Sequence, residues 1–197
     1  ENVELCRVLS RTEGIDAVEL NVSCPNVKQG VMAFGTDLVV FTDLVEKVRK
    51  VTECALIVKL SPNVTDITQF AVRAEEIGAE AVSAINTLLG MKIDIKKRKP
   101  HFSNKVAGLS GPAIRPVAVR IVYQIYSKVK IPVIGMGGIS TIEDVVEFMM
   151  AGASAVSIGT STLIEPSIPE KLVHELEKYL AEESFGSINE LIGAAHQ

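Results

Sequence analysis

The sequence predicts a single α/β domain with a parallel sheet, and three observations support this fold class. Short runs rich in β-branched residues alternate with longer segments of helical periodicity. Most of these runs are continuously apolar, as in parallel strands that are covered on both faces. Polar residues and glycines follow each run, at the edge where parallel sheets bind ligands. The pattern fits an open sheet or part of a closed barrel.

Five segments are predicted strands: Ala17–Val22, Leu56–Leu60, Ala81–Ile85, Pro132–Gly135 and Ala155–Ile158. A closed eight-stranded barrel typically needs ~250 residues. Five strands in 197 residues therefore predict either an open sheet or the C-terminal part of such a barrel.

Helices are predicted at the N-terminus and over Thr36–Val51, Thr65–Ile77, Arg115–Val129, Thr141–Ala151 and Ile168–Glu183. The segment that begins at Thr141 has acidic residues in its first turn and Gly152 after its last, which are typical start and stop signals. A long connection from Leu88 to Gly111 carries the basic run KIDIKKRKP. It is interpreted as a lid or insertion near a site, or as a solvated loop.

Composition excludes several classes of function. The net charge is −4 and there is no basic block, which argues against nucleic acid as a partner. No apolar run reaches the ~18 residues of a membrane span, and the first residues do not form a signal peptide. The sequence has three cysteines, Cys6, Cys24 and Cys54, which lie far apart. Their odd number and their spacing match neither a disulfide framework nor a metal-binding motif. We expect a cytoplasmic protein without a metal site.

The candidate functional residues all follow predicted strands, where we expect one common rim. They are Asn21 and Cys24, Lys59, Asn86 and Thr87, Gly137 and Gly138, and Gly159 and Thr160. Turn chemistry alone also places polar residues at strand ends.

Lys59 interrupts an apolar strand, and a buried ammonium needs an anion or another acceptor. It either faces a negatively charged ligand at the rim or reaches solvent from an edge strand. The loops GMGGIST and IGTST each join a strand to a helix, where backbone and helix N-terminal N–H groups can receive a phosphate. Simple tight turns are the alternative. Ser140 replaces the third glycine of a dinucleotide fingerprint, so dinucleotide binding is weakly supported.

Cys24 lies between Asn21 and Asn26, with a proline behind it. A free thiol titrates near pH ~8.5 and can serve as a nucleophile or a general base. Packing is the alternative, and it is the preferred interpretation for Cys6 and Cys54. No histidine is placed to suggest a cysteine–histidine pair.

The motifs ELNVSCPN, VKLSPNVTDI, INTLLGM, GLSGPAIRPVA, IPVIGMGGI and AGASAVSIGT resemble those of dihydroorotate dehydrogenases in order and spacing, from about Ala17 to Thr160. The resemblance is greatest to class I enzymes of the NAD-linked, two-subunit type. Membrane-associated class II enzymes have serine where Cys24 stands. Dihydropyrimidine dehydrogenases, which resemble the same region, typically have SCPH, whereas this sequence has Asn26.

The resemblance implies a (β/α)₈ TIM barrel that binds FMN, with the five predicted strands as strands four to eight and the first three missing. Residues 1–197 are then one domain, the C-terminal part of that barrel. The implied reaction is the oxidation of dihydroorotate to orotate in pyrimidine biosynthesis.

By matched position, Cys24 resembles the base that removes the C5 proton while the C6 hydride passes to flavin N5. The implied substrate-binding residues are Asn21, Asn26, Asn86 and Thr87. The implied FMN-binding residues are Asn21, Lys59, Ile85, Gly111, Gly137, Gly138, Gly159 and Thr160.

The resemblance also implies a homodimer and a partner subunit that holds FAD and a [2Fe–2S] cluster and passes electrons to NAD. A fumarate-linked type without this partner stays open. Two further alternatives are dihydropyrimidine oxidation and a non-catalytic barrel fragment that acts as an interaction module.

Overall fold

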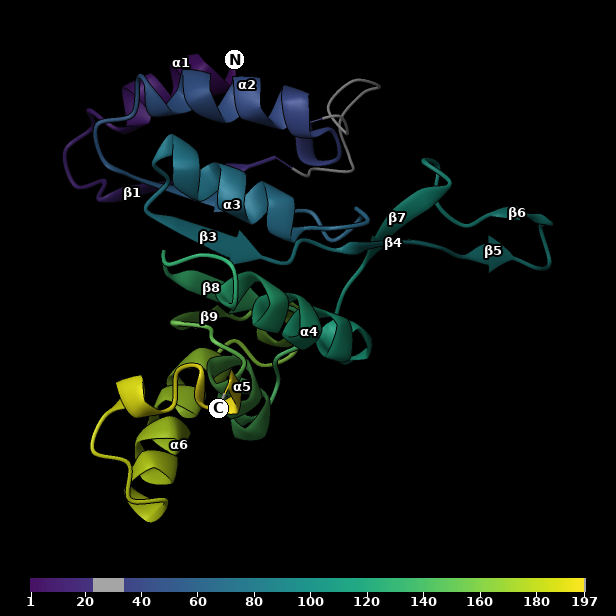
Figure 1. Ribbon diagram of the computed structural model, residues 1–197. Coiled ribbons are helices and arrows are strands. Elements are labelled where there is room, and N and C mark those ends of the chain that lie inside the picture. Colours follow the sequence, from purple (N-terminus) through teal and green to yellow (C-terminus); the bar gives the residue numbers. More distant parts are fainter. Residues whose placement is uncertain (23–33, 197) are drawn as a thin grey trace.

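The computed structural model describes residues 1–22 and 34–196. Within these residues, five parallel strands form one sheet in the order β1-β2-β3-β8-β9 (Figure 1). Their bounds are β1 (Ala17–Asn21), β2 (Ala55–Lys59), β3 (Ala81–Ala84), β8 (Val133–Met136) and β9 (Ala155–Ser157). The prediction of a parallel α/β fold with these five strands is confirmed.

Each predicted helix is present, with its ends moved by a few residues. The bounds are α1 (Asn2–Leu9), α2 (Leu38–Arg49), α3 (Thr68–Ile77), α4 (Arg115–Tyr126), α5 (Ile142–Met150) and α6 (Ile168–Glu182). Short 3₁₀ helices are η2 (Pro112–Ile114), η3 (Thr160–Leu163), η4 (Ile188–Glu190) and η5 (Ala194–His196). Successive helices pack against one another along the sheet (Figure 1). This arrangement follows from right-handed crossovers between neighbouring parallel strands.

The sheet is covered by helices on one face, which corrects the expectation that both faces are covered. In β1, Val18 and Leu20 are buried in the core whereas Glu19 and Asn21 are exposed. In β2 the buried residues likewise alternate with half-buried ones. The apolar runs of β1 and β2 therefore have a period of two in burial, whereas all four residues of β3 are buried.

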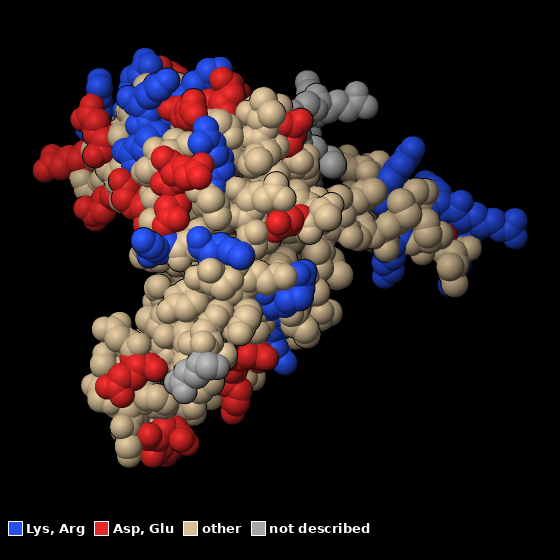
Figure 2. Space-filling model, viewed as in Figure 1, with Lys and Arg blue, Asp and Glu red and all other residues tan. Residues whose placement is uncertain are grey.

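The segment between β3 and α4 forms an arm of antiparallel strands where the sequence predicts a loop. Strand β4 (Leu88–Met91) pairs with β7 (Val106–Leu109), and β5 (Ile93–Asp94) pairs with β6 (Lys99–Pro100). The side chain of Asp94 accepts hydrogen bonds from the backbone N–H groups of Lys96 and Lys97, which closes the turn at the tip. The arm projects away from the sheet, and its lysines and arginine give it a basic surface (Figures 1 and 2).

None of the helices in the described part of the chain has the length and apolar character needed to cross a lipid bilayer.

Candidate functional site

A cleft of about 180 Å³ lies at the carboxyl ends of the parallel strands. Its walls come from Lys59, Ile85, Asn86, Thr87, Ser110, Gly111, Ile114, Met136, Gly137, Gly138, Ser157, Gly159 and Thr160. Every described residue of the predicted site lines this cleft except Asn21. Segments more than 100 positions apart in sequence thus meet at one rim, as strand topology requires.

Asn21 joins the same rim through a hydrogen bond. Its side-chain Oδ1 accepts from Asn86 Nδ2 across 3.1 Å. The Asn86 side-chain oxygen accepts from the backbone N–H of Thr87 at 2.8 Å. The two remaining predicted residues, Cys24 and Asn26, lie outside the described residues.

Lys59 stands on an interior strand of the sheet, so the alternative of an edge-strand lysine is wrong. It is level with Asn21 on one side and Ser83 on the other. Its Nζ lies 3.3 Å from Oε1 of Glu19, and its side chain is 22% exposed. The Glu19 carboxylate was missed in the sequence, although a strand's period of two places it on the same face as Asn21.

The loop after β8 requires glycine at two consecutive positions. Gly137 has φ 133° and Gly138 has φ 80°, a region that side chains disfavour. A Cβ at position 138 would lie 2.7 Å from the carbonyl oxygen of Gly111 and 3.0 Å from Arg115 Cβ. At Gly159, by contrast, a Cβ would meet no atom within 4 Å. Among described residues, the backbone N–H groups of Gly138 and Gly159 have no hydrogen-bond acceptor.

The N-terminus of α5 is occupied by a side chain of the protein. Asp144 is buried, and its Oδ2 accepts hydrogen bonds from the backbone N–H groups of Ser140 at 2.8 Å and Thr141 at 3.1 Å. Its other oxygen pairs with the Arg115 guanidinium. Asp144 thus provides the acceptor for the two N–H groups that directly precede α5. The N–H groups open to an anion are those of the glycine loops.

Sequence reasoning also missed four lining residues, which are Ser110, Ile114, Met136 and Ser157. Thr160 Oγ1 donates to Ser110 Oγ at 2.9 Å, which ties the β9 loop to the segment after β7. The GLSGP motif contains Ser110 directly before Gly111, so its place in the motif was an available signal.

The remaining two cysteines behave as core thiols. Cys6 is buried and Cys54 is half-buried against the core. Burial, and secondarily the nearby Cys54, raise the pKa of the Cys6 thiol above its ordinary value. A thiol in such surroundings is a poor base or nucleophile at neutral pH.

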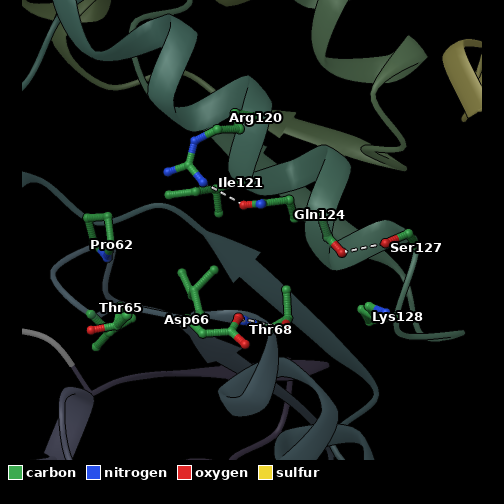
Figure 3. Close-up of a pocket in the computed structure, with 11 residues that line it drawn as sticks. Pro62, Thr65, Asp66, Thr68, Arg120, Ile121, Gln124, Ser127 and Lys128 are labelled. Atoms are coloured by element: carbon green, nitrogen blue, oxygen red, sulfur yellow. Dashed lines mark hydrogen bonds between the residues drawn. The ribbon is translucent and has the colours of Figure 1, made fainter.

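A second, larger pocket of about 320 Å³ lies between the β2–α3 connection and α4 (Figure 3). Its polar groups already bond to one another. Asp66 accepts hydrogen bonds from Thr68, and Arg120 donates to Gln124 at 2.6 Å. The strand-end cleft is therefore the better candidate, because its glycine N–H groups have no acceptor in the described chain.

The family model of dihydroorotate dehydrogenase matches residues 1–180. The chain belongs to the dihydroorotate dehydrogenase family. The family predicted from the sequence motifs is thus confirmed.

Curated relatives of this family are about half identical to the chain. The catalytic subunit of dihydroorotate dehydrogenase B (NAD(+)) from Desulforamulus reducens is 51% identical over 193 residues, which are 98% of this chain and 64% of the relative. The protein of the same name from Parabacteroides distasonis is 53% identical, over 98% of the chain and 63% of the relative. A relative from Aquifex aeolicus, provisionally named dihydroorotate dehydrogenase A (fumarate), is 50% identical over the whole chain and 65% of its own length. The chain spans somewhat less than two thirds of these dihydroorotate dehydrogenases. The predicted likeness to the NAD-linked type is confirmed.

Proposed function

We propose that this chain carries the catalytic residues of a dihydroorotate dehydrogenase, which oxidises dihydroorotate to orotate in pyrimidine biosynthesis with FMN as its cofactor. The observation that carries the proposal is the strand-end cleft of a family member. There Lys59, the amide of Asn86 and the glycine loops after β8 and β9 meet in one concave site. Membership of the family supports the reaction type, and the cleft is where we propose that the reaction takes place.

The sheet supports a barrel in which these strands are five of eight. Helices cover one face, and the other face turns Glu19 and Asn21 toward the side that a barrel would enclose. Strands β1 and β9 are the edges of the described sheet, and β9 keeps exposed Ala155 and Ser157. Further strands that pair with these edges would close the barrel and complete the site. On this proposal, residues 1–197 belong to one barrel domain.

The described residues fit FMN in charge and in shape. The backbone N–H groups of Gly138 and Gly159 lack acceptors in the described chain, and the space beside Gly159 admits close approach by a phosphate. The hydroxyl of Thr160 lies at the same rim. When bound, FMN supplies the acceptor for the C6 hydride of dihydroorotate.

Other residues that line the cleft would make the remaining contacts with FMN. Lys59 would provide a positive charge in the cleft to stabilise the negative charge of the reduced flavin ring. Ile85 and Gly111 would contact the ring, and Gly137 allows the tight turn from which the N–H of Gly138 would bind the phosphate.

On the substrate side, the side-chain amides of Asn21 and Asn86 and the hydroxyl of Thr87 bind and orient dihydroorotate, and Asn26 joins them. Cys24 accepts the C5 proton. It follows the end of β1 by three residues in the sequence.

The name "catalytic subunit" of the relatives supports a protein partner. We include in the proposal a homodimer and an electron-transfer subunit with FAD and a [2Fe–2S] cluster, with NAD as the final acceptor.

Two measurements on the purified protein test this function. Titration with FMN, followed by flavin fluorescence and absorbance, should show saturable binding. Stopped-flow mixing of the FMN-loaded protein with dihydroorotate should then bleach the flavin, whereas dihydrouracil should not. Faster bleaching by dihydrouracil would favour dihydropyrimidine oxidation. Failure to take up FMN would favour the non-catalytic module.

A further inference from the structure

Glu19 contacts two side chains, that of Lys59, which lines the cleft, and that of Ser83, which is buried below it. Its Oε1 lies 3.3 Å from Lys59 Nζ, and its Oε2 accepts a hydrogen bond from Ser83 Oγ at 2.7 Å. The three side chains come from β1, β2 and β3 and lie on the face of the sheet opposite the helices. Lys59 lines the cleft, whereas Glu19 does not.

The Ser83 hydroxyl fixes the direction of the Glu19 carboxylate. Ser83 is fully buried, so its hydroxyl needs an acceptor, and Glu19 provides it. Because Ser83 on β3 holds the Glu19 carboxylate in one direction, the carboxylate cannot move freely with the ammonium of Lys59 on β2. The position of the Lys59 ammonium is therefore set by a fixed negative charge below the cleft.

We infer that Glu19 is a positioning residue that acts through Lys59 and sets the reduction potential of the flavin. The inference rests on the proposed function, because it takes Lys59 to be the cation beside the flavin ring. The ammonium is shared between the Glu19 carboxylate and the ring. Negative charge on the reduced ring is stabilised less when the carboxylate holds the ammonium, so Glu19 lowers the potential.

The test is the flavin midpoint potential of the FMN-loaded protein, measured by equilibration with reference dyes. Glu19→Gln keeps the shape of the side chain and an acceptor for Ser83, but it removes the charge. We expect it to shift the two-electron equilibrium toward reduced flavin by about tenfold or more, which is a rise of about 30 mV or more. Glu19→Asp keeps the charge and should restore most of the wild-type potential.

The matched control is Asp43→Asn, which breaks the ion pair between Asp43 and Lys47 on the outer helix α2. It removes an identical charge from a carboxylate–lysine pair far from the cleft, and the potential should not change. Glu19→Leu removes the Glu19 charge through an apolar side chain and should raise the potential as Glu19→Gln does.

An unchanged potential in Glu19→Gln or Glu19→Leu, with only the melting temperature altered, would make Glu19 a structural residue and overturn the inference. Loss of folded protein in both variants would do the same. The proposed function would survive these outcomes, because wild-type protein would still bind FMN and be reduced by dihydroorotate. A wild-type protein that takes up no FMN would instead overturn the function and this inference together.

Discussion

The side chain of Asn86 donates a hydrogen bond to the side chain of Asn21 across 3.1 Å. Asn21 ends β1 and Asn86 lies two residues after β3, and β2, which ends at Lys59, lies between these two strands in the sheet. The backbone of Asn86 is fixed as well, because its N–H donates to the carbonyl oxygen of Leu60 at 3.1 Å. The two side-chain amides are thus joined to each other at the rim that Lys59 also lines.

Replacement of Asn86 by alanine should weaken the use of dihydroorotate more than the binding of FMN. A hydrogen bond to a charged group contributes about 1.5–3 kcal/mol, so kcat/KM should fall by roughly 10- to 100-fold. Steady-state kinetics and an FMN titration on the same preparation measure the two effects. Asn104→Ala, on the exposed arm, is the control and should leave kcat/KM unchanged. An Asn86→Ala variant with wild-type kcat/KM would remove Asn86 from the site.

Cys24→Ser should slow the reduction of the flavin by dihydroorotate at neutral pH. A serine hydroxyl is a much weaker base than a thiol, and a general base typically contributes 10²- to 10⁴-fold. Stopped-flow absorbance at several pH values measures the rate.

The control for the Cys24 experiment is Cys54→Ser, which alters a half-buried thiol that packs against the core. It should reduce stability slightly and leave the reduction rate unchanged. Equal reduction rates in Cys24→Ser and the wild type would show that another group takes the C5 proton.

The strands and helices could be predicted because their signals are local. Apolar runs bounded by polar or glycine residues, together with helix caps such as Thr141 and Asp144, depend on a few neighbouring residues. The arm was missed for the opposite reason. Its strands are only two to four residues long, and Leu88 and Leu109 face each other only once the chain has folded back. Asn63 shows the same limit, since its side chain bonds the backbone of Thr87 and Leu89 and so anchors the arm.

The candidate site could be predicted in outline because parallel strands deliver their carboxyl ends to one edge. Its supporting contacts could not, because they depend on the register between strands. Nothing near Lys59 in the sequence indicates that Glu19, 40 positions earlier, is its partner. The Arg115–Asp144 pair likewise joins α4 and α5, which are 29 positions apart at these residues.

The two glycine loops allow matched alanine substitutions with opposite expected results. Gly138→Ala forces a side chain into a left-handed backbone and against the Gly111 carbonyl oxygen, so it should destabilise the fold by about 1–3 kcal/mol. Gly159→Ala adds a methyl group where no atom lies within 4 Å, and its φ is −108°. It should leave unfolding nearly unchanged but weaken FMN binding, because the methyl group occupies the space proposed for the phosphate.

Urea unfolding without FMN and a fluorescence titration with FMN separate the two effects. If Gly159→Ala binds FMN as tightly as the wild type, the phosphate does not lie beside Gly159. If Gly138→Ala is as stable as the wild type, the backbone at that loop adapts and the tight turn is not required.

Asp66 stabilises the start of α3, and this contribution should depend on pH. Its Oδ1 accepts hydrogen bonds from the Thr68 backbone N–H at 2.9 Å and from the Thr68 hydroxyl at 2.6 Å. These bonds, the hydroxyl first, lower the pKa of the Asp66 carboxyl below its ordinary 3.8. A carboxyl whose pKa is lower in the folded state stabilises the fold above its ordinary pKa. That stability is lost as the pH falls through the lowered value.

Asp66→Asn should therefore destabilise the protein by about 0.3–1 kcal/mol at pH 7, the usual contribution of a negative charge near a helix N-terminus. Below pH ~4 the difference from the wild type should shrink, because the wild-type carboxyl then takes up a proton. Urea unfolding of both proteins at neutral and acidic pH measures the difference. Asp16→Asn, which changes an exposed aspartate with no side-chain hydrogen bond among the described residues, should alter stability little at either pH. A constant difference between Asp66→Asn and the wild type across this range would mean that the Asp66 carboxylate contributes shape and not charge.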